Sequence, residues 1–170
     1  MRRPASRWCR LPSPVGELLL TAGDGALTGL YMAAEPHAAV PLAGPATPDE
    51  PVLAETKRQL AAYFAGTLTA FTLPLALHGT AFQRRVWEQL LALPHGTTTT
   101  YAAIAGRLGQ PTALRAVGAA NGRNPVSIVV PCHRVVGSDG TLTGYGGGLP
   151  AKRWLLDHEA AVRARRTGPA

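Results

Sequence analysis

Residues 101–125, YAAIAGRLGQPTALRAVGAANGRNP, read as two short helices joined by a tight turn. The first helix is predicted from Tyr101 to Leu108, and a break follows at Gly109 and Gln110. Pro111, a residue favoured at the first helical position, opens a second helix that runs to about Asn121. Two short helices with this connection are typical of the helix-turn-helix motif.

The second of these helices carries unusually small side chains, namely Ala113, Ala116, Gly118, Ala119, Ala120 and Gly122. A smooth helix surface can approach a nucleic-acid backbone closely. Small residues can equally reflect tight packing against another helix, and this feature alone does not decide between the two interpretations.

Upstream of the motif, the pattern predicts one more helix in the same domain. Thr80 and Gln83 have the spacing of a capping box, and an apolar stripe follows that ends at Pro94. The stripe consists of Phe82, Val86, Leu90 and Leu93.

The first third of the chain reads as an α/β region. Two strands are predicted at 17–22 and 26–32, separated by the turn residues Gly23-Asp24-Gly25. Residues 33–51 lack periodicity and are expected to form a loop. An amphipathic helix is predicted from Val52 to a stop at Gly66, and residues 71–77 could add a strand.

Charge is distributed unevenly between the two halves of the chain. Residues 1–78 hold six basic and six acidic residues, whereas residues 79–170 hold eleven basic and four acidic ones and therefore all of the net charge of +7. A basic half suggests a polyanionic partner, nucleic acid first of all. The alternative is a basic surface that serves only solubility.

The chain has only two cysteines, Cys9 and Cys132, too few for a disulfide framework. A thiol-preserving, cytoplasmic compartment is therefore expected. The N-terminal region has no apolar stretch longer than Leu18 to Leu20, so neither a signal peptide nor a membrane span is predicted.

Cys132 follows an apolar, β-branched run, Val126 to Val130, that resembles a short buried strand between prolines. A lone cysteine is more often inert than nucleophilic, so Cys132 needs a neighbouring base, and His133 is the nearest candidate. Adjacent side chains of a strand point to opposite faces, so contact requires a turn or a bridging water.

The last predicted helix, which begins near Pro150, supplies an acid. Leu155, Glu159 and Val162 share one face, and an acid among apolar residues needs a partner. A hydrogen bond from His133 to Glu159 would fix the imidazole tautomer and make it a better base toward the thiol. The alternative is a surface pair between Glu159 and Arg163.

Three motifs together resemble the O6-alkylguanine-DNA alkyltransferases. They are PCHRV (131–135), GYGGGL (144–149) and KRWLLDHE (152–159), and FQRRVW, TTYAAIA and ALRAVGAANGRNP extend the resemblance over most of residues 80–160. The resemblance implies an α/β N-terminal domain of ribonuclease-H-like type over 1–78. It also implies a mainly α, winged-helix/helix-turn-helix DNA-binding domain over 79–165, followed by a short tail at 166–170.

The resemblance also implies the reaction: irreversible, single-turnover transfer of an alkyl group from O6-alkylguanine in double-stranded DNA to the protein's own cysteine after base flipping. O4-alkylthymine is a possible further substrate. No cofactor and no membrane association are expected, and the protein is expected to be a monomer in the cytoplasm that joins the nucleoid when bound to DNA.

Site roles carry over by position. Cys132 is the alkyl acceptor, His133 the base acting through water, and Glu159 its orienting carboxylate. Asn124 matches the hinge asparagine that braces the site, and Tyr101 the tyrosine placed to rotate the phosphate and protonate the departing guanine.

The expected DNA contacts centre on Arg115, the finger that replaces the extruded base, with Tyr101, Ala116, Gly118, Ala119 and Arg123. Backbone groups of Cys132, Val135, Tyr145 and Gly146 are expected to read the guanine edge. Gly146 stands where some relatives have serine, so only its backbone can act. Asn121 and Ser127 occupy pocket positions that vary within the family.

Two other function classes are weighed against this one. A Cys-His-Glu hydrolase would need an oxyanion hole and turnover, and an adjacent cysteine and histidine is an unusual placement for such a triad. A non-catalytic helix-turn-helix binder is opposed by Cys132, which is replaced in the family's non-repairing relatives.

Some relatives hold a structural zinc in the N-terminal domain. Here Cys9 stands alone, and His37 and His78 have no ligand-like spacing with it, so no metal is expected and Cys9 is interpreted as a non-catalytic thiol.

Overall fold

The computed structural model describes residues 5–36 and 38–168. They divide into two units, one formed by residues up to 78 together with 125–127, the other by 79–124 and 128 onward. His37 and residues 169–170 of the predicted tail lie outside the described residues. No helix in the described part is long and apolar enough to span a membrane.

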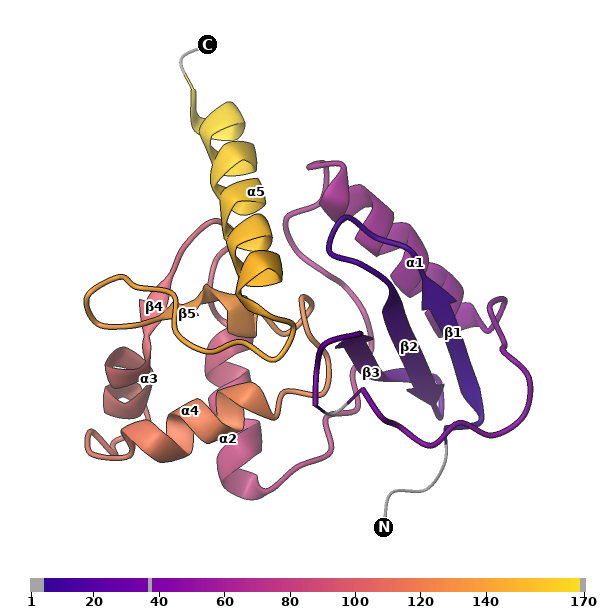
Figure 1. Cartoon of the computed structure of the whole chain (residues 1–170), viewed down its shortest axis with the longest axis horizontal. Helices are drawn as coiled ribbons and strands as arrows, with labels where there is room; N and C mark the ends of the chain where they lie inside the picture. Colours follow the sequence, from indigo (N-terminus) through magenta and orange to yellow (C-terminus); the bar gives the residue numbers. More distant parts are fainter. Residues whose placement is uncertain (1–4, 37, 169–170) are drawn as a thin grey trace. The chain divides into compact units, whose positions relative to one another are not determined.

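The first unit is an antiparallel sheet with one helix packed against it (Figure 1). Its strands lie in the order β1 (Arg7–Leu11), β2 (Leu18–Gly23) and β3 (Ala26–Met32), and α1 spans Pro51–Phe64. The predicted hairpin is β2 and β3, with a bulge at Thr21/Ala22. The strand β1 was not predicted. Residues 71–77 form only an isolated bridge, Leu27 to Leu75, rather than the strand we expected.

The second unit is mainly helical (Figure 1). It contains α2 (Ala81–Leu91), α3 (Tyr101–Arg107), α4 (Leu114–Gly122) and α5 (Leu149–Thr167), with a 3-10 turn η1 (Cys132–Arg134). Two short strands, β4 (Thr99–Thr100) and β5 (Val135–Val136), pair in parallel. The predicted capping box is present at the start of α2, where Thr80 and Gln83 each bond the other's backbone N–H. An α/β first unit and a mainly α second unit confirm the predicted fold class.

Two differences concern helix ends. Pro111 lies in a turn, and α4 begins later than predicted, at Leu114. The helix α5 continues to Thr167, so Arg166 belongs to the helix rather than to a tail.

The buried side of α4 packs within the second unit. Val117 and Ala120 are buried, and the indole Nε1 of Trp87 on α2 donates to the carbonyl oxygen of Ala120 at 2.9 Å. Ala116 and Ala119 lie exposed on the other side of α4. Packing therefore explains Ala120, and it leaves the small residues on the outer side of the helix open to a partner.

The run Val126 to Val130 is buried, as expected, but it is not a strand. Its first residues join the first unit, where Leu30 N donates to Pro125 O at 2.9 Å and Ser127 N donates to Leu30 O at 3.0 Å. Ile128, the next residue, has φ of 71°. A β-branched residue rarely adopts this left-handed conformation. The conformation interrupts the extended run before the chain reaches Cys132.

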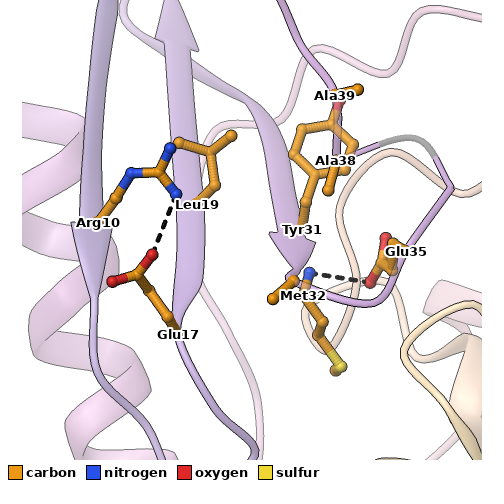
Figure 2. Close-up of a pocket in the computed structure, with 9 residues that line it drawn as sticks. Arg10, Glu17, Leu19, Tyr31, Met32, Glu35, Ala38 and Ala39 are labelled. Carbon is orange, nitrogen blue, oxygen red and sulfur yellow. Dashed lines mark hydrogen bonds and ion pairs between the residues drawn. The ribbon is translucent and has the colours of Figure 1, made fainter.

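A buried carboxylate holds the same segment. Glu35 Oε1 accepts from the backbone N–H of Met32 at 3.2 Å and from the hydroxyl of Ser127 at 2.7 Å. Glu35 borders a cavity of about 330 Å³ in the first unit (Figure 2). Arg10 and Glu17 also line this cavity and form an exposed ion pair with each other. Burial raises the pKa of Glu35 to about 7, although both hydrogen bonds oppose the shift.

We expect the Glu35→Gln variant to flatten the pH dependence of stability. The folded-state pKa of about 7 exceeds the ordinary value of 4.5, so the contribution of Glu35 is fully present below pH 4.5 and is lost as the pH rises through 7. The loss is at most on the order of 3 kcal/mol. Urea denaturation at several pH values should show that the free energy of unfolding of the variant rises relative to that of the wild type between pH 4.5 and pH 7. An unchanged difference across this range would contradict the assignment, and Glu17→Gln, at an exposed carboxylate, is the control.

Candidate active site

Cys132 begins η1 and is almost completely buried, with 4% of its surface exposed. Two asparagines, one in the last turn of α4 and one just after the helix, hold the backbone around it. Asn124 Nδ2 donates to Val130 O at 2.7 Å, and Asn121 Nδ2 donates to Cys132 O at 3.4 Å. Asn124 thus bonds the segment before Cys132, and Asn121 bonds the cysteine itself; the role of Asn124 as the hinge residue stays a prediction.

Glu159 is the centre of a buried hydrogen-bond network. Its carboxylate accepts from His133 Nε2 at 2.8 Å and from two guanidinium nitrogens of Arg134, Nε at 2.9 Å and Nη2 at 2.8 Å. The backbone N–H of Gly96 adds a bond of 3.2 Å, and Arg134 Nη1 also donates to Leu93 O. Burial by itself raises the pKa of Glu159, but the bonds from His133 and Arg134 outweigh it and hold that pKa below its ordinary value.

This network excludes the surface pair that we considered for Glu159. Arg163 instead donates from Nη1 to Gly96 O at 3.2 Å. Gly96 has φ of +75°, and a Cβ built there would come within 3.0 Å of the Arg163 side chain. A glycine is therefore needed for the loop to pass so close to α5.

The carboxylate determines the state of the His133 ring. Because Glu159 can only accept, His133 Nε2 carries the proton and Nδ1 presents a lone pair. Burial lowers the pKa of His133 even though Glu159 favours the charged form, so the imidazole is neutral at pH 7. Nδ1 is buried and has no hydrogen-bond partner among the residues that the structure describes. A water molecule or a substrate proton is the kind of partner that such an atom requires.

Lys152, like Arg134, is a charged residue of the site that was not predicted. Its side chain is fully buried, and its Nζ donates to Val135 O at 2.6 Å and to Thr143 O at 3.2 Å. Burial lowers the pKa of Lys152, and the charge of a Cys132 thiolate opposes the shift. Lys152 lies three residues before Leu155 and seven before Glu159, so its place on the apolar face of α5 was the available signal.

Tyr101 and Arg115 border an open hollow of about 490 Å³ in the second unit. Tyr101 is the first residue of α3, and Arg115 is exposed on α4. The other lining residues are Ala102, Leu114, Gly118, Ser138, Thr143 and Gly144. The remaining predicted DNA contacts lie on α4 or at its C-terminal end. Ala116, Ala119 and Arg123 are exposed, and Gly118 is half-buried.

The predicted guanine-reading residues follow Cys132. Val135 is buried in β5, with its carbonyl oxygen bonded to Lys152. Tyr145 and Gly146 are half-buried in the loop before α5, and the Tyr145 ring lies 5.8 Å from Lys152 Nζ.

Ser127 belongs to the first unit, where its hydroxyl donates to Glu35 Oε1 at 2.7 Å. The pocket position that we expected for Ser127 therefore rests on the resemblance alone.

No cluster of three or more histidine, cysteine, aspartate or glutamate side chains that could hold a metal ion occurs in the described ranges, 5–36 and 38–168. Cys9 is buried in β1, and burial raises the pKa of its thiol. A thiol of that kind is a poor nucleophile.

Comparisons with known proteins match both halves of the chain. Residues 81–161 match the model of the 6-O-methylguanine DNA methyltransferase DNA-binding domain, and residues 7–77 match that of the ribonuclease-like domain of the same proteins. The ribonuclease-like model therefore matches the α/β part of the chain, and the DNA-binding model matches the mainly α part.

Individual relatives cover nearly the whole chain. It is 49% identical to a methylated-DNA–protein-cysteine methyltransferase of Mycobacterium leprae, over 89% of this chain and 91% of the relative. A Methanosarcina barkeri protein of the same name is 45% identical over 88% and 94%. The crystal structure of Mycobacterium tuberculosis OGT in complex with DNA superposes with a TM-score of 0.82 at 47% identity, covering 92% of this chain and 94% of that one. On these matches the chain belongs to the 6-O-methylguanine DNA methyltransferase family.

Proposed function

We propose that this protein repairs alkylated double-stranded DNA directly, by transferring the alkyl group from O6 of guanine to Cys132 in a single turnover. The observation that carries the proposal is the state of His133: a neutral imidazole held by Glu159, with a buried, unpartnered Nδ1 next to the cysteine in sequence. A thiol beside a prepared base can be converted to a thiolate, which is the nucleophile that alkyl transfer requires.

The proton of Cys132 passes to His133 through a bridging water. His133 and Cys132 are adjacent in η1, and the Nε2 of the ring is already committed to Glu159, so only Nδ1 is available to accept. Positive charge develops on the imidazole when it accepts this proton, and the Glu159 carboxylate, which Arg134 also binds, stabilises it. Lys152 supplies a positive charge that favours the thiolate.

The transfer is an in-line displacement at the alkyl carbon. The thiolate electron pair forms the S–C bond while the C–O6 bond breaks, and the electron pair of that bond remains on the guanine. Tyr101 is the proposed donor of a proton to the departing base. The product thioether has no good leaving group and no carbonyl for water to attack, so each molecule acts once.

DNA docks on the exposed side of α4. Arg115, Ala116, Ala119 and Arg123 are all solvent-exposed, and small side chains allow a close approach of the phosphate backbone. A stacked guanine hides its O6, so the nucleotide must be flipped out at a cost of a few kcal/mol, and Arg115 fills the gap. We propose that the protein acts as a monomer in the cytoplasm, on the nucleoid.

Replacing Cys132 with alanine should abolish alkyl transfer and leave DNA binding intact, because the side chain supplies the nucleophile and no phosphate contact. Intact-mass measurement after exposure to O6-methylguanine DNA, with peptide mapping, should find one methyl group on the Cys132 peptide of the wild type and none on the variant. Cys9→Ala is the matched control and should still accept one methyl. Release of more than one equivalent of dealkylated guanine per protein would refute single-turnover transfer and favour a hydrolase.

The pH profile of single-turnover transfer should report the state of His133. Because burial lowers the pKa of this histidine from its ordinary value of 6.5, the neutral base persists below that pH. We expect the rate constant to fall on acidification with a midpoint below pH 6.5. Far-UV circular dichroism at each pH separates this limb from acid unfolding. A midpoint at or above 6.5 would contradict the buried, neutral imidazole.

A further inference from the structure

One hydrogen bond at the open hollow beside Tyr101 and Arg115 takes no part in the reaction proposed above. Thr143 Oγ1, in the loop before α5, donates to the hydroxyl oxygen of Tyr101 at 3.1 Å. Both residues line the same hollow, 42 positions apart in the sequence. We propose that Thr143 is a positioning residue that aims the Tyr101 proton at the flipped nucleotide; this inference rests on the proposed function.

The direction of the bond decides what Tyr101 can do. A phenol has one O–H donor and an oxygen that also accepts. Because Thr143 donates, the acceptor side of the Tyr101 oxygen is occupied, and the Tyr101 proton must point to another acceptor. The open hollow is the space that remains beside it.

The aromatic ring of Tyr101 is fixed at its other end. Tyr101 opens α3, whose preceding residue Thr100 caps the helix by accepting from Ala103 N at 3.1 Å. One edge of the ring lies over α4 at Gly118, where an added Cβ would be 3.9 Å from Cδ1 and Cε1. The ring therefore has a defined base, and Thr143 defines the position of its hydroxyl.

Thr143 is in turn tied to the cysteine segment. Its carbonyl oxygen accepts from Lys152 Nζ, and the same ammonium group binds Val135 O, three residues after Cys132. Lys152 is fully buried and cannot move freely. The thiol and the phenol are thus linked through one lysine, which sets the distance between the attacking group and the proton donor.

The bond from Thr143 strengthens as the reaction proceeds. When the C–O6 bond breaks, the guanine takes the Tyr101 proton, and negative charge develops on the phenol oxygen. A hydrogen bond to a charged oxygen is stronger than one to a neutral oxygen, so Thr143 stabilises the transition state more than the bound substrate. The phenolate recovers a proton from solvent once the DNA has left.

The test compares Thr143→Val, which removes the donor at nearly constant shape, with Thr143→Ser, which keeps it. In single-turnover transfer from O6-methylguanine DNA, T143V should lower the maximal rate constant about fivefold. The DNA concentration for half-maximal rate should stay unchanged, and T143S should recover most of the rate. Thr141→Val is the matched control in the same loop, because the Thr141 hydroxyl bonds Asp139 instead, and its rate should equal that of the wild type.

A double-mutant cycle with Tyr101→Phe tests whether Thr143 acts through Tyr101. In the Y101F background, T143V should have no further effect on the rate constant. The inference is overturned if T143V slows Y101F as much as it slows the wild type, if T143S is as slow as T143V, or if T143V changes only DNA affinity. Failure of the wild-type protein to transfer a methyl group would instead count against the proposed function.

Discussion

The second unit depends on one buried carboxylate. Glu159 joins α5, η1 and the loop before β4, and it does so with four hydrogen bonds from His133, Arg134 and Gly96. Moving a carboxylate and a guanidinium out of water is costly, and the cost is met only when nearly every donor and acceptor is satisfied. Here the geometry provides that, and removing one partner from a buried pair of this kind costs on the order of 3–5 kcal/mol. The same contacts that stabilise the packing of α5 therefore fix the tautomer of His133.

Much of this architecture could be predicted because it depends on local sequence patterns. The capping box at Thr80, the turn between β2 and β3, and the apolar face of α5 each depend on residues close together in sequence, and the helices followed from them. The pairing of His133 with Glu159 also followed, since an acid on an apolar helix face must find a partner. Arg134 was not predicted, because an arginine next to His133 in sequence is normally expected on the surface. Only the structure shows that Glu159 accepts hydrogen bonds from both residues.

Contacts between distant segments set the limit of prediction. The run Val126 to Val130 has the composition of a strand, but Leu30 of β3 bonds the backbone at Pro125 and Ser127, and Ile128 adopts a left-handed conformation that interrupts the run. Ser127 consequently bonds Glu35, 92 positions away, which no periodicity could indicate. The strand β1 was missed for a related reason: only its pairing with β2 distinguishes Arg7–Leu11 from an irregular polar segment.

The helix α4 explains how one short element can serve both recognition and chemistry. Its exposed side carries Arg115, whereas its buried side ends in Asn121, which donates to the carbonyl oxygen of Cys132. Asn121 lies six positions after Arg115, a rise of roughly 9 Å along a helix axis. A rigid helix of this length does not bend appreciably, so in the proposed docking the outer side of α4 also fixes the distance between the DNA backbone and the cysteine. The thiol is nearly inaccessible to solvent, so under the proposed function the flipped nucleotide has to be directed to it.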